Sequence, residues 1–68
     1  MKKKLARRQL EILQLISEGF TAVEIGKQLG ISHRTVNVQV TSMFSKTGAK
    51  NAPHLIKLSI INGDIKLK

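Results

Sequence analysis

Residues 21–36 read TAVEIGKQLGISHRTV, and this stretch decides the fold. Thr21, followed three residues later by Glu24, forms a capping-box pattern that predicts the start of a helix. Gly30 is suited to the left-handed conformation that ends many helices. Ser32 comes two residues later and predicts the N-cap of the next helix. The stretch therefore predicts two helices that are joined by a very short turn.

Gly26 lies inside the first of these two helices. A mid-helix glycine costs about 1 kcal/mol relative to alanine, so its presence favours a packing reason. Two helices joined by so short a turn cross steeply, and a bulky side chain at the crossing would hold the backbones apart. The pattern is typical of a helix-turn-helix, whose second helix can enter the major groove of DNA. A plain helical hairpin within a bundle is the structural alternative.

The rest of the chain also reads as helix. Apolar residues recur at i, i+3 and i+6 within residues 6–18, which predicts a first helix there. The two helices of the pair span 22–29 and 33–47, and Asn51 predicts the N-cap of a fourth helix that ends near residue 62. β-Branched residues rarely alternate with polar ones, so strands have little support. The predicted fold is all-α: a four-helix bundle with a helix-turn-helix and without a wing.

Length and composition limit the chain to one small domain. Its 68 residues are expected to bury only roughly 60% of the surface of the unfolded chain. We expect a basic N-terminal arm at 1–4, the domain at 5–65 and a C-terminal tail at 66–68. The lack of cysteine excludes disulfides and thiolate metal sites. No apolar run approaches the ~20 residues of a membrane helix, and the basic start lacks the apolar stretch of a secretory signal. The expected location is therefore the cytoplasm.

The charge balance favours a polyanionic partner. Twelve Lys and Arg residues against four Asp and Glu give a net charge of +8, which suits nucleic acid, an anionic membrane or an acidic protein. Phe20 and Phe44 are the only aromatic residues, which argues against single-strand binders that stack bases on aromatic rings. Duplex DNA needs no aromatic platform. A basic surface that is merely solvated remains the alternative.

Several segments match, in order, the motifs of a known family. Residues 5–13 read LARRQLEIL where that family has Leu-Thr-x-Arg-Glu-x-Glu-Val-Leu. Residues 19–26 match Gly-x-x-x-x-Glu-Ile-Ala, and residues 29–40 match Leu-x-Ile-Ser-x-x-Thr-Val-Lys-x-His-Val. The family's Lys-Leu-Gly falls on residues 46–48. Over about residues 5–65 the chain resembles the DNA-binding domain of the LuxR-type (GerE-type) transcription regulators.

The resemblance implies a helix-turn-helix that dimerises through its fourth helix, and we expect this chain to act as a free-standing regulator. It also implies groove contacts from the positions of Asn37, Val38 and Thr41. Among its departures from the family pattern, Gln9 replaces the usual Glu, Asn37 the usual Lys and Gln39 the usual His.

The predicted third helix, residues 33–47, separates into two faces at about 100° per residue. The arc expected to face the core consists of Val36, Val40, Met43, Phe44 and Thr47. The opposite arc is polar, short-chained and almost free of acidic residues, so it can lie close to DNA. The predicted DNA-binding residues are Ser32, Arg34, Thr35, Asn37, Val38, Thr41, Ser42, Ser45, Lys46, Lys27 and Lys50.

Their side chains predict different roles. Ser32, Thr35 and the helix N-terminus can donate hydrogen bonds to a phosphate. Asn37 prefers adenine and Arg34 prefers guanine, while Val38 can touch a thymine methyl group. For each residue singly, exposure to solvent without any DNA contact is the alternative.

The remaining cations are expected to position the protein rather than to read sequence. Lys27, Lys46 and Lys50 are candidates for phosphate contacts. Five of the twelve Lys and Arg residues lie within the first eight positions. This segment is either an arm laid along the DNA or a solubilising tail.

The fourth helix has two apolar arcs, and a helix that is apolar on both sides is usually buried on both sides. The arc expected to close the core consists of Ala52, Leu55, Ile56, Ser59 and Ile60. The outer arc consists of Leu58 and Ile61, joined by Ile65, and His54 lies near it. We predict that these four residues form a homodimer interface. Scattered exposed aliphatic residues are the alternative.

Enzymatic chemistry has little support in this sequence. His33 and His54 are the only imidazoles, and the four acidic residues are dispersed. We therefore expect no catalytic residue, no metal site and no cofactor. The expected function is a sequence-specific, duplex-DNA-binding transcription regulator that acts as a homodimer, its activity set by abundance or by a partner protein. The alternative is a protein-interaction module that binds and modulates another regulator. A cationic membrane helix is the weaker alternative, because capped helices favour a globular fold.

Overall fold

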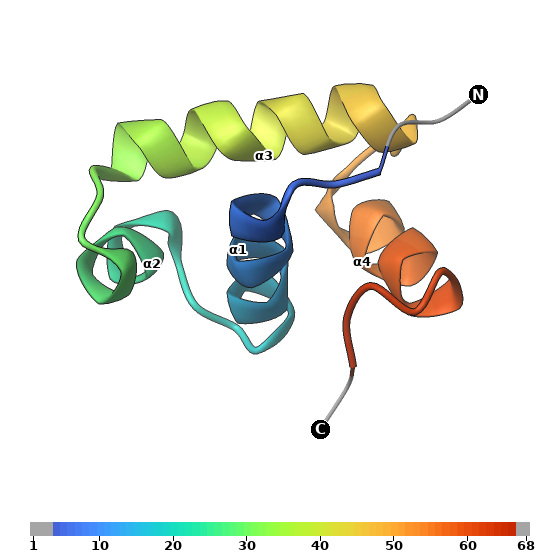
Figure 1. Ribbon diagram of the computed structural model, residues 1–68, viewed down its shortest axis with the longest axis horizontal. Coiled ribbons are helices and arrows are strands. Elements are labelled where there is room, and N and C mark those ends of the chain that lie inside the picture. The colour runs from blue at the N-terminus through green and yellow to red at the C-terminus, as the bar shows by residue number, and fades with distance from the viewer. Residues whose placement is uncertain (1–3, 67–68) are drawn as a thin grey trace.

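The structure is a computed structural model that describes residues 4–66. These residues form four α-helices and no strand, and none of the helices is long and apolar enough to cross a membrane. The helices are α1 (Arg7–Ser17), α2 (Ala22–Leu29), α3 (His33–Thr47) and α4 (Ala52–Ile61) (Figure 1). The predicted all-α fold of four helices is confirmed. Residues 1–3 of the expected arm and residues 67–68 of the expected tail lie outside the described part of the chain.

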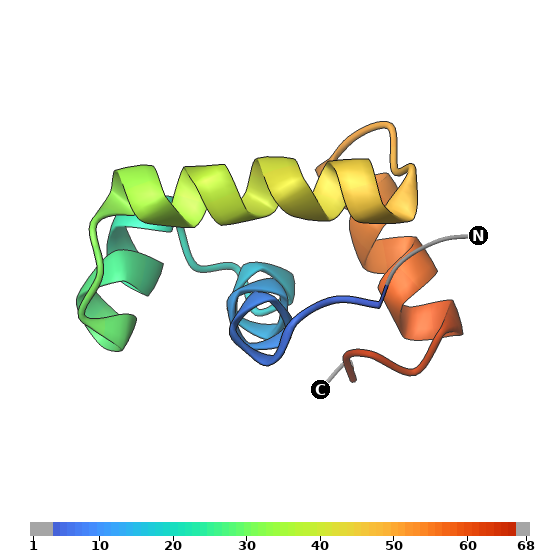
Figure 2. The same cartoon turned by 45° about the horizontal axis from the view of Figure 1, so that its top comes forward.

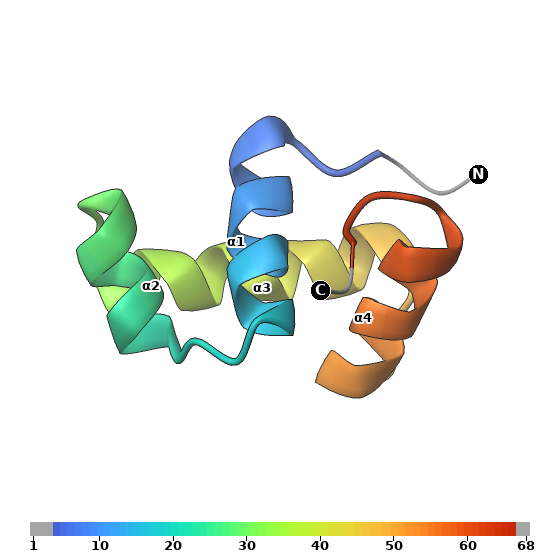
Figure 3. The same cartoon turned by 90° about the horizontal axis from the view of Figure 1, so that it is seen from below.

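The longest helix, α3, lies across the other three. Figure 1 shows α3 along one edge of the molecule, with α1, α2 and α4 together on one side of it. The turned view in Figure 2 and the view from below in Figure 3 agree with this arrangement. The helix α2 packs against the N-terminal half of α3, α1 crosses its middle and α4 packs near its C-terminal end. The opposite side of α3 is therefore left uncovered by the other helices.

Local capping fixes the helix ends where the sequence predicts them. The Oγ1 atom of Thr21 accepts the N–H of Glu24 at 3.2 Å, and a carboxylate oxygen of Glu24 accepts the N–H of Thr21 at 2.9 Å. This backbone hydrogen bond from Thr21 lowers the pKa of the Glu24 carboxyl below its usual value. Gly30 ends α2 with a φ of 72°, and Ser32 caps α3 by accepting an N–H at 3.1 Å.

Gly26 has the packing role that its position predicts. The turn after α2 brings the carbonyl oxygen of Ile31 so close that a Cβ atom on Gly26 would lie 2.5 Å from it and 3.3 Å from the backbone nitrogen of His33. The N–H of Ile31 also donates to the carbonyl oxygen of Gly26 at 2.9 Å. Only glycine allows α2 and the start of α3 to approach this closely.

The core contains one residue that the sequence placed elsewhere. Its fully or nearly fully buried apolar side chains are Ile12, Leu13, Ile25, Val36, Met43, Leu55 and Ile65. The expectation that Ile65 lies on an outer, dimer-forming face is wrong, because its side chain is only 3% exposed. After α4 the chain reverses at Gly63, whose φ is 78°. The segment that follows returns to α1, where the N–H of Lys66 donates to Oε1 of Gln14 at 3.2 Å and Nε2 of Gln14 donates to the carbonyl oxygen of Lys66 at 3.0 Å.

The helix α4 buries a narrower stripe than the sequence predicts. Leu55 and Ser59 are buried, whereas Ala52 is exposed and Ile60 is 37% exposed. Among the helices α4 packs chiefly against α3, and contact with a single neighbour covers only part of a helix. Ala52 and Ile60 therefore do not belong to the core, although the helical pattern assigned them to it.

Candidate nucleic-acid interface

The uncovered side of α3 carries a continuous row of exposed side chains. They are Arg34, Asn37, Val38, Thr41 and Ser45. Val38 is 61% exposed, although it is aliphatic. The helix contains no Asp or Glu, so nothing on it repels a phosphate backbone. The angular prediction from the sequence places Arg34, Val38, Thr41 and Ser45 on one arc with Asn37 on its flank, and all five are exposed in the structure.

Hydroxyl groups near the start of α3 are already engaged with the helix. The Oγ atom of Ser32 accepts the N–H of Thr35 and lies 2.9 Å from Oγ1 of Thr35. One turn further on, Oγ1 of Thr41 donates to the carbonyl oxygen of Asn37 at 3.0 Å. The hydroxyl proton of Thr41 is therefore already hydrogen-bonded within the helix. This side chain presents its methyl group and an acceptor oxygen to the exterior.

Two predicted contact residues face α1 rather than the open side. Ser42 is half-buried, and its Oγ accepts Nε2 of Gln9 at 3.1 Å. Lys46 is also half-buried, and its Nζ donates to Oε1 of Gln9 at 2.8 Å. The angular pattern of the sequence puts Ser42 on the outer arc of α3, but in the structure Ser42 lies on the flank where α1 crosses α3.

Gln9 is the residue that sequence reasoning missed. Its side chain is 3% exposed, and its amide makes four hydrogen bonds, to the backbone of Ala6 and to Gln39, Ser42 and Lys46. The residues at 9, 12, 13 and 16 share one face of α1, at the i, i+3, i+4 and i+7 spacing of a buried stripe. A polar residue within that stripe was the available signal, because a buried amide needs partners.

Lys27 and Lys50 are exposed, as phosphate contacts require. Lys27 lies in the last turn of α2. The N–H of Lys50 donates to Nδ1 of His54 at 3.0 Å, which ties the loop before α4 to the first turn of that helix. His54 therefore holds a local loop, whatever else it contacts.

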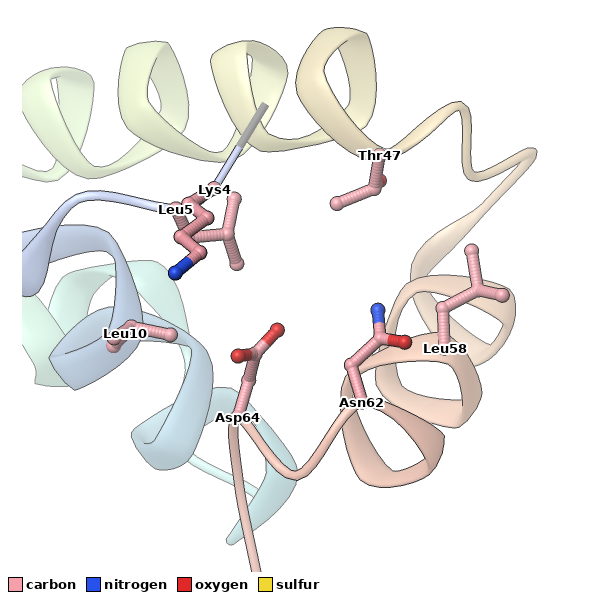
Figure 4. A pocket seen from close by; sticks show the side chains of 7 residues that line it. All are labelled: Lys4, Leu5, Leu10, Thr47, Leu58, Asn62 and Asp64. Atoms are coloured by element: carbon pink, nitrogen blue, oxygen red, sulfur yellow. The ribbon is translucent and has the colours of Figure 1, made fainter. Parts of the chain in front are cut away.

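The predicted dimer residues are placed differently from one another. Ile61 is 68% exposed and stands beside the exposed Ile60, whereas His54 and Leu58 are half-buried. Leu58 lines a cavity of about 510 Å³ between α1 and α4 (Figure 4). The other side chains of this cavity are Lys4, Leu5, Leu10, Thr47, Asn62 and Asp64. The exposed apolar surface of α4 thus centres on Ile60 and Ile61.

Within residues 4–66 no three potential metal-ligating side chains come together. The side chains that the structure does gather are hydrogen-bonding groups and cations on and beside α3. Such groups bind phosphates and base edges.

Comparison with known proteins identifies relatives of this chain. A family model described as bacterial regulatory proteins of the luxR family matches residues 3–59. The chain is 38% identical over 58 residues to the oxygen regulatory protein NreC of Staphylococcus aureus, in strains JH9 and JH1 alike. This similarity covers 85% of the chain and 27% of the relative, so the chain spans about a quarter of the length of the curated relatives it matches.

A solved structure gives a similar result. The crystal structure of the Vibrio cholera VqmA–ligand–DNA complex matches 94% of this chain and 28% of its own chain, with a TM-score of 0.82 and 33% sequence identity. The resemblance indicated by the sequence motifs is confirmed.

Proposed function

The chain belongs to the luxR family of bacterial regulatory proteins, and on this premise we propose that it binds a specific duplex DNA site as a homodimer, with α3 in the major groove. The family consists of regulatory DNA-binding proteins rather than enzymes. The observation that carries the proposal is the uncovered face of α3, which is exposed, polar and without acidic residues. A helix with these properties fits the major groove. We propose residues 5–65 as the folded unit, because Leu5 and Ile65 both pack on the core.

The exposed residues of α3 divide into base-reading and positioning groups. In this proposal Arg34 reads guanine, Asn37 reads adenine and Val38 contacts a thymine methyl group. Thr41 presents its methyl group to a neighbouring base, because its hydroxyl proton is held by the carbonyl oxygen of Asn37. Ser45 extends the same face toward the DNA backbone.

Phosphate contacts surround this reading face. Ser32 and Thr35 stand at the N-terminus of α3, where the helix dipole favours an anion. The ammonium groups of Lys27, Lys46 and Lys50 supply charge at the edges of the helix-turn-helix. These contacts position the protein without reading sequence, so they predict a strong dependence of the affinity on salt.

The exposed apolar part of α4 supports a dimer. Ile60 and Ile61 lie next to each other in the last turn of α4, and Leu58 stands half-buried one turn earlier. A second copy packed against this surface in a two-fold arrangement would cover both isoleucines. The two α3 helices would then read half-sites about one helical turn apart.

Selection from a random duplex pool tests the proposal directly. The selected duplex is then titrated by fluorescence anisotropy at several salt concentrations. We expect a two-fold motif, an affinity well above that for bulk DNA and a steep fall of affinity with salt. Recovery of no motif, together with weak charge-driven binding only, would contradict the proposal and favour a protein-interaction module.

A further inference from the structure

The amide of Gln9 lies at the centre of a polar contact between α1 and α3. Gln9 is 3% exposed, and its partners Gln39, Ser42 and Lys46 all lie on α3 at the i, i+3 and i+7 positions of one stripe. Within residues 4–66 no buried side-chain nitrogen or oxygen lacks a partner. Every buried polar atom of this contact therefore has a hydrogen-bond partner, and the contact joins α1 to the middle and C-terminal part of the proposed reading helix, α3.

The direction of every hydrogen bond in this contact follows from two obligate donors. The Oε1 atom of Gln9 receives the N–H of Ala6 at 2.9 Å and Nζ of Lys46 at 2.8 Å. A backbone N–H and an ammonium can only donate, so the atom between them must be the amide oxygen. The amide nitrogen of Gln9 then faces α3, where Gln39 and Ser42 must both accept.

This direction determines what the neighbouring side chains show to the exterior. Gln39 turns its Oε1 toward Nε2 of Gln9 at 3.0 Å, so its own NH₂ group points away from Gln9. Ser42 accepts with its Oγ, which leaves its hydroxyl proton free to donate outward. Lys46 uses one N–H on a neutral amide and keeps its full charge.

We propose that Gln9 is a positioning residue that turns the hydrogen-bond donors of Gln39, Ser42 and Lys46 toward the DNA phosphates, and that Gln39 is a further phosphate-contacting residue. This inference rests on the proposed function. Phosphate oxygens accept hydrogen bonds and never donate them, so a stripe that shows donors only is suited to the backbone that borders the groove. The neutrality of Gln9 matters as much as its geometry, because a carboxylate at the same point would accept from every partner.

Replacement of the buried amide by a carboxylate tests both parts. In Gln9→Glu the carboxylate pairs with Lys46, draws the NH₂ group of Gln39 inward and takes the hydroxyl proton of Ser42. We expect a lower affinity for duplex DNA and a plot of log affinity against log salt that is shallower by about 0.9, the loss of one phosphate contact. Lys46→Gln is expected to reduce the slope by the same amount.

Two variants separate this role from a merely structural one. Gln9→Met keeps the volume and removes the hydrogen bonds without adding charge. It is expected to weaken binding to every duplex, because Gln39, Ser42 and Lys46 lose the group that positions them, and to lower the slope less than Gln9→Glu does, because Lys46 gains no carboxylate partner. Gln28→Glu adds the same charge at an exposed position of α2, in the lining of a pocket to which Glu11 and Glu18 also contribute, and is expected to keep the wild-type slope. A wild-type slope for folded Gln9→Glu, or wild-type affinity for folded Gln9→Met, would overturn the proposal.

The orientation itself is measured without DNA, by nitrogen-15 NMR of the free protein. We expect the side-chain NH₂ protons of Gln9 to exchange slowly and to show nuclear Overhauser effects to the Hβ protons of Ser42. Those of Gln39 are expected to exchange fast in the wild-type protein and to become protected in Gln9→Glu. Protected Gln39 protons in the wild type would refute the orientation. The wild-type protein could show the expected exchange pattern and yet bind no duplex at any salt concentration. In that case the proposed function and the DNA role of Gln9 both fail, while the conclusion that Gln9 orients the amide of Gln39 stands.

Discussion

At the scale of single residues, Gly26 is the position where one methyl group has the largest expected effect. Gly26→Ala places a Cβ atom 2.5 Å from the carbonyl oxygen of Ile31, so the backbone of the turn must move. We expect a loss of about 1–3 kcal/mol in the free energy of unfolding, although alanine favours a helix interior by about 1 kcal/mol. Urea denaturation measures the loss. The control is Gln28→Ala, at an exposed position of the same helix, which is expected to change stability by at most about 0.5 kcal/mol. Equal stability of the two variants would contradict the close approach of Gly26 to the carbonyl oxygen of Ile31.

The base reading that we propose is also tested at single residues. Arg34→Ala and Asn37→Ala are each expected to lose about 1–3 kcal/mol of discrimination between the selected site and a scrambled duplex. Lys50→Ala serves as the matched control, because loss of a phosphate contact weakens binding to both duplexes alike. Anisotropy titrations of the two duplexes give the ratio of affinities. An unchanged ratio in Asn37→Ala would show that the reading face lies elsewhere on α3.

At the scale of the element, the cap of α2 predicts a dependence of stability on pH. The pKa of Glu24 is lower in the folded state, chiefly through the backbone hydrogen bond from Thr21. Its stabilisation is therefore complete above the unfolded pKa, about 4.3, and is lost as the pH falls through the lower folded value. We expect Glu24→Gln to flatten the fall of Tm between about pH 5 and pH 3. Equal falls in both proteins, measured by circular dichroism, would mean that this cap does not titrate with folding.

The helix bounds could be predicted from the sequence because capping is local. Thr21, Gly30 and Ser32 act on atoms only a few residues away, so the sequence around them contains the whole interaction. The burial of Gln9 could not be located in this way, since its partner Gln39 lies 30 residues further along the chain. Ile65 was misplaced for the same reason, because α1 and not the α4 pattern decides where the returning segment packs.

The candidate site also contains residues that the sequence placed correctly and residues whose position depends on distant contacts. The helical period placed Arg34, Asn37 and Val38 on one exposed face, and the structure has them there. The same period put Ser42 on the exposed arc, whereas the packing of α1 against α3 places Ser42 and Lys46 on the flank of that arc. Residues in the middle of a face were therefore predictable, and residues on its flank were not.

At the scale of the whole molecule, the exposed end of α4 predicts association. Ile61→Asp is expected to convert dimers to monomers in analytical ultracentrifugation. The monomeric variant is expected to remain folded and to unfold cooperatively on heating. Ile61 is 68% exposed, so a charge there disturbs no core contact. Val23→Asp, which replaces a 50% exposed valine on α2, is expected to remain dimeric. A wild-type protein that stays monomeric at high concentration would contradict the dimer.

The core also depends on the segment after α4. Ile65→Ala removes a side chain that is 3% exposed and is expected to cost about 2–5 kcal/mol of unfolding free energy. Ile61→Ala makes the same chemical change at the exposed end of α4 and is expected to cost far less. Urea denaturation of both variants checks this difference, and similar losses would remove Ile65 from the core.

The attachment of Lys66 to Gln14 joins positions that are 52 residues apart. During synthesis from the N-terminus, α1 is made long before the residues that complete its packing. A nascent chain that has emerged only as far as the end of α3 therefore carries the whole of the proposed reading helix on an incomplete core. Since domains fold as units when their contacts become available, a newly made chain of this protein is expected to acquire protease resistance late, once residue 66 has emerged and can pack on α1.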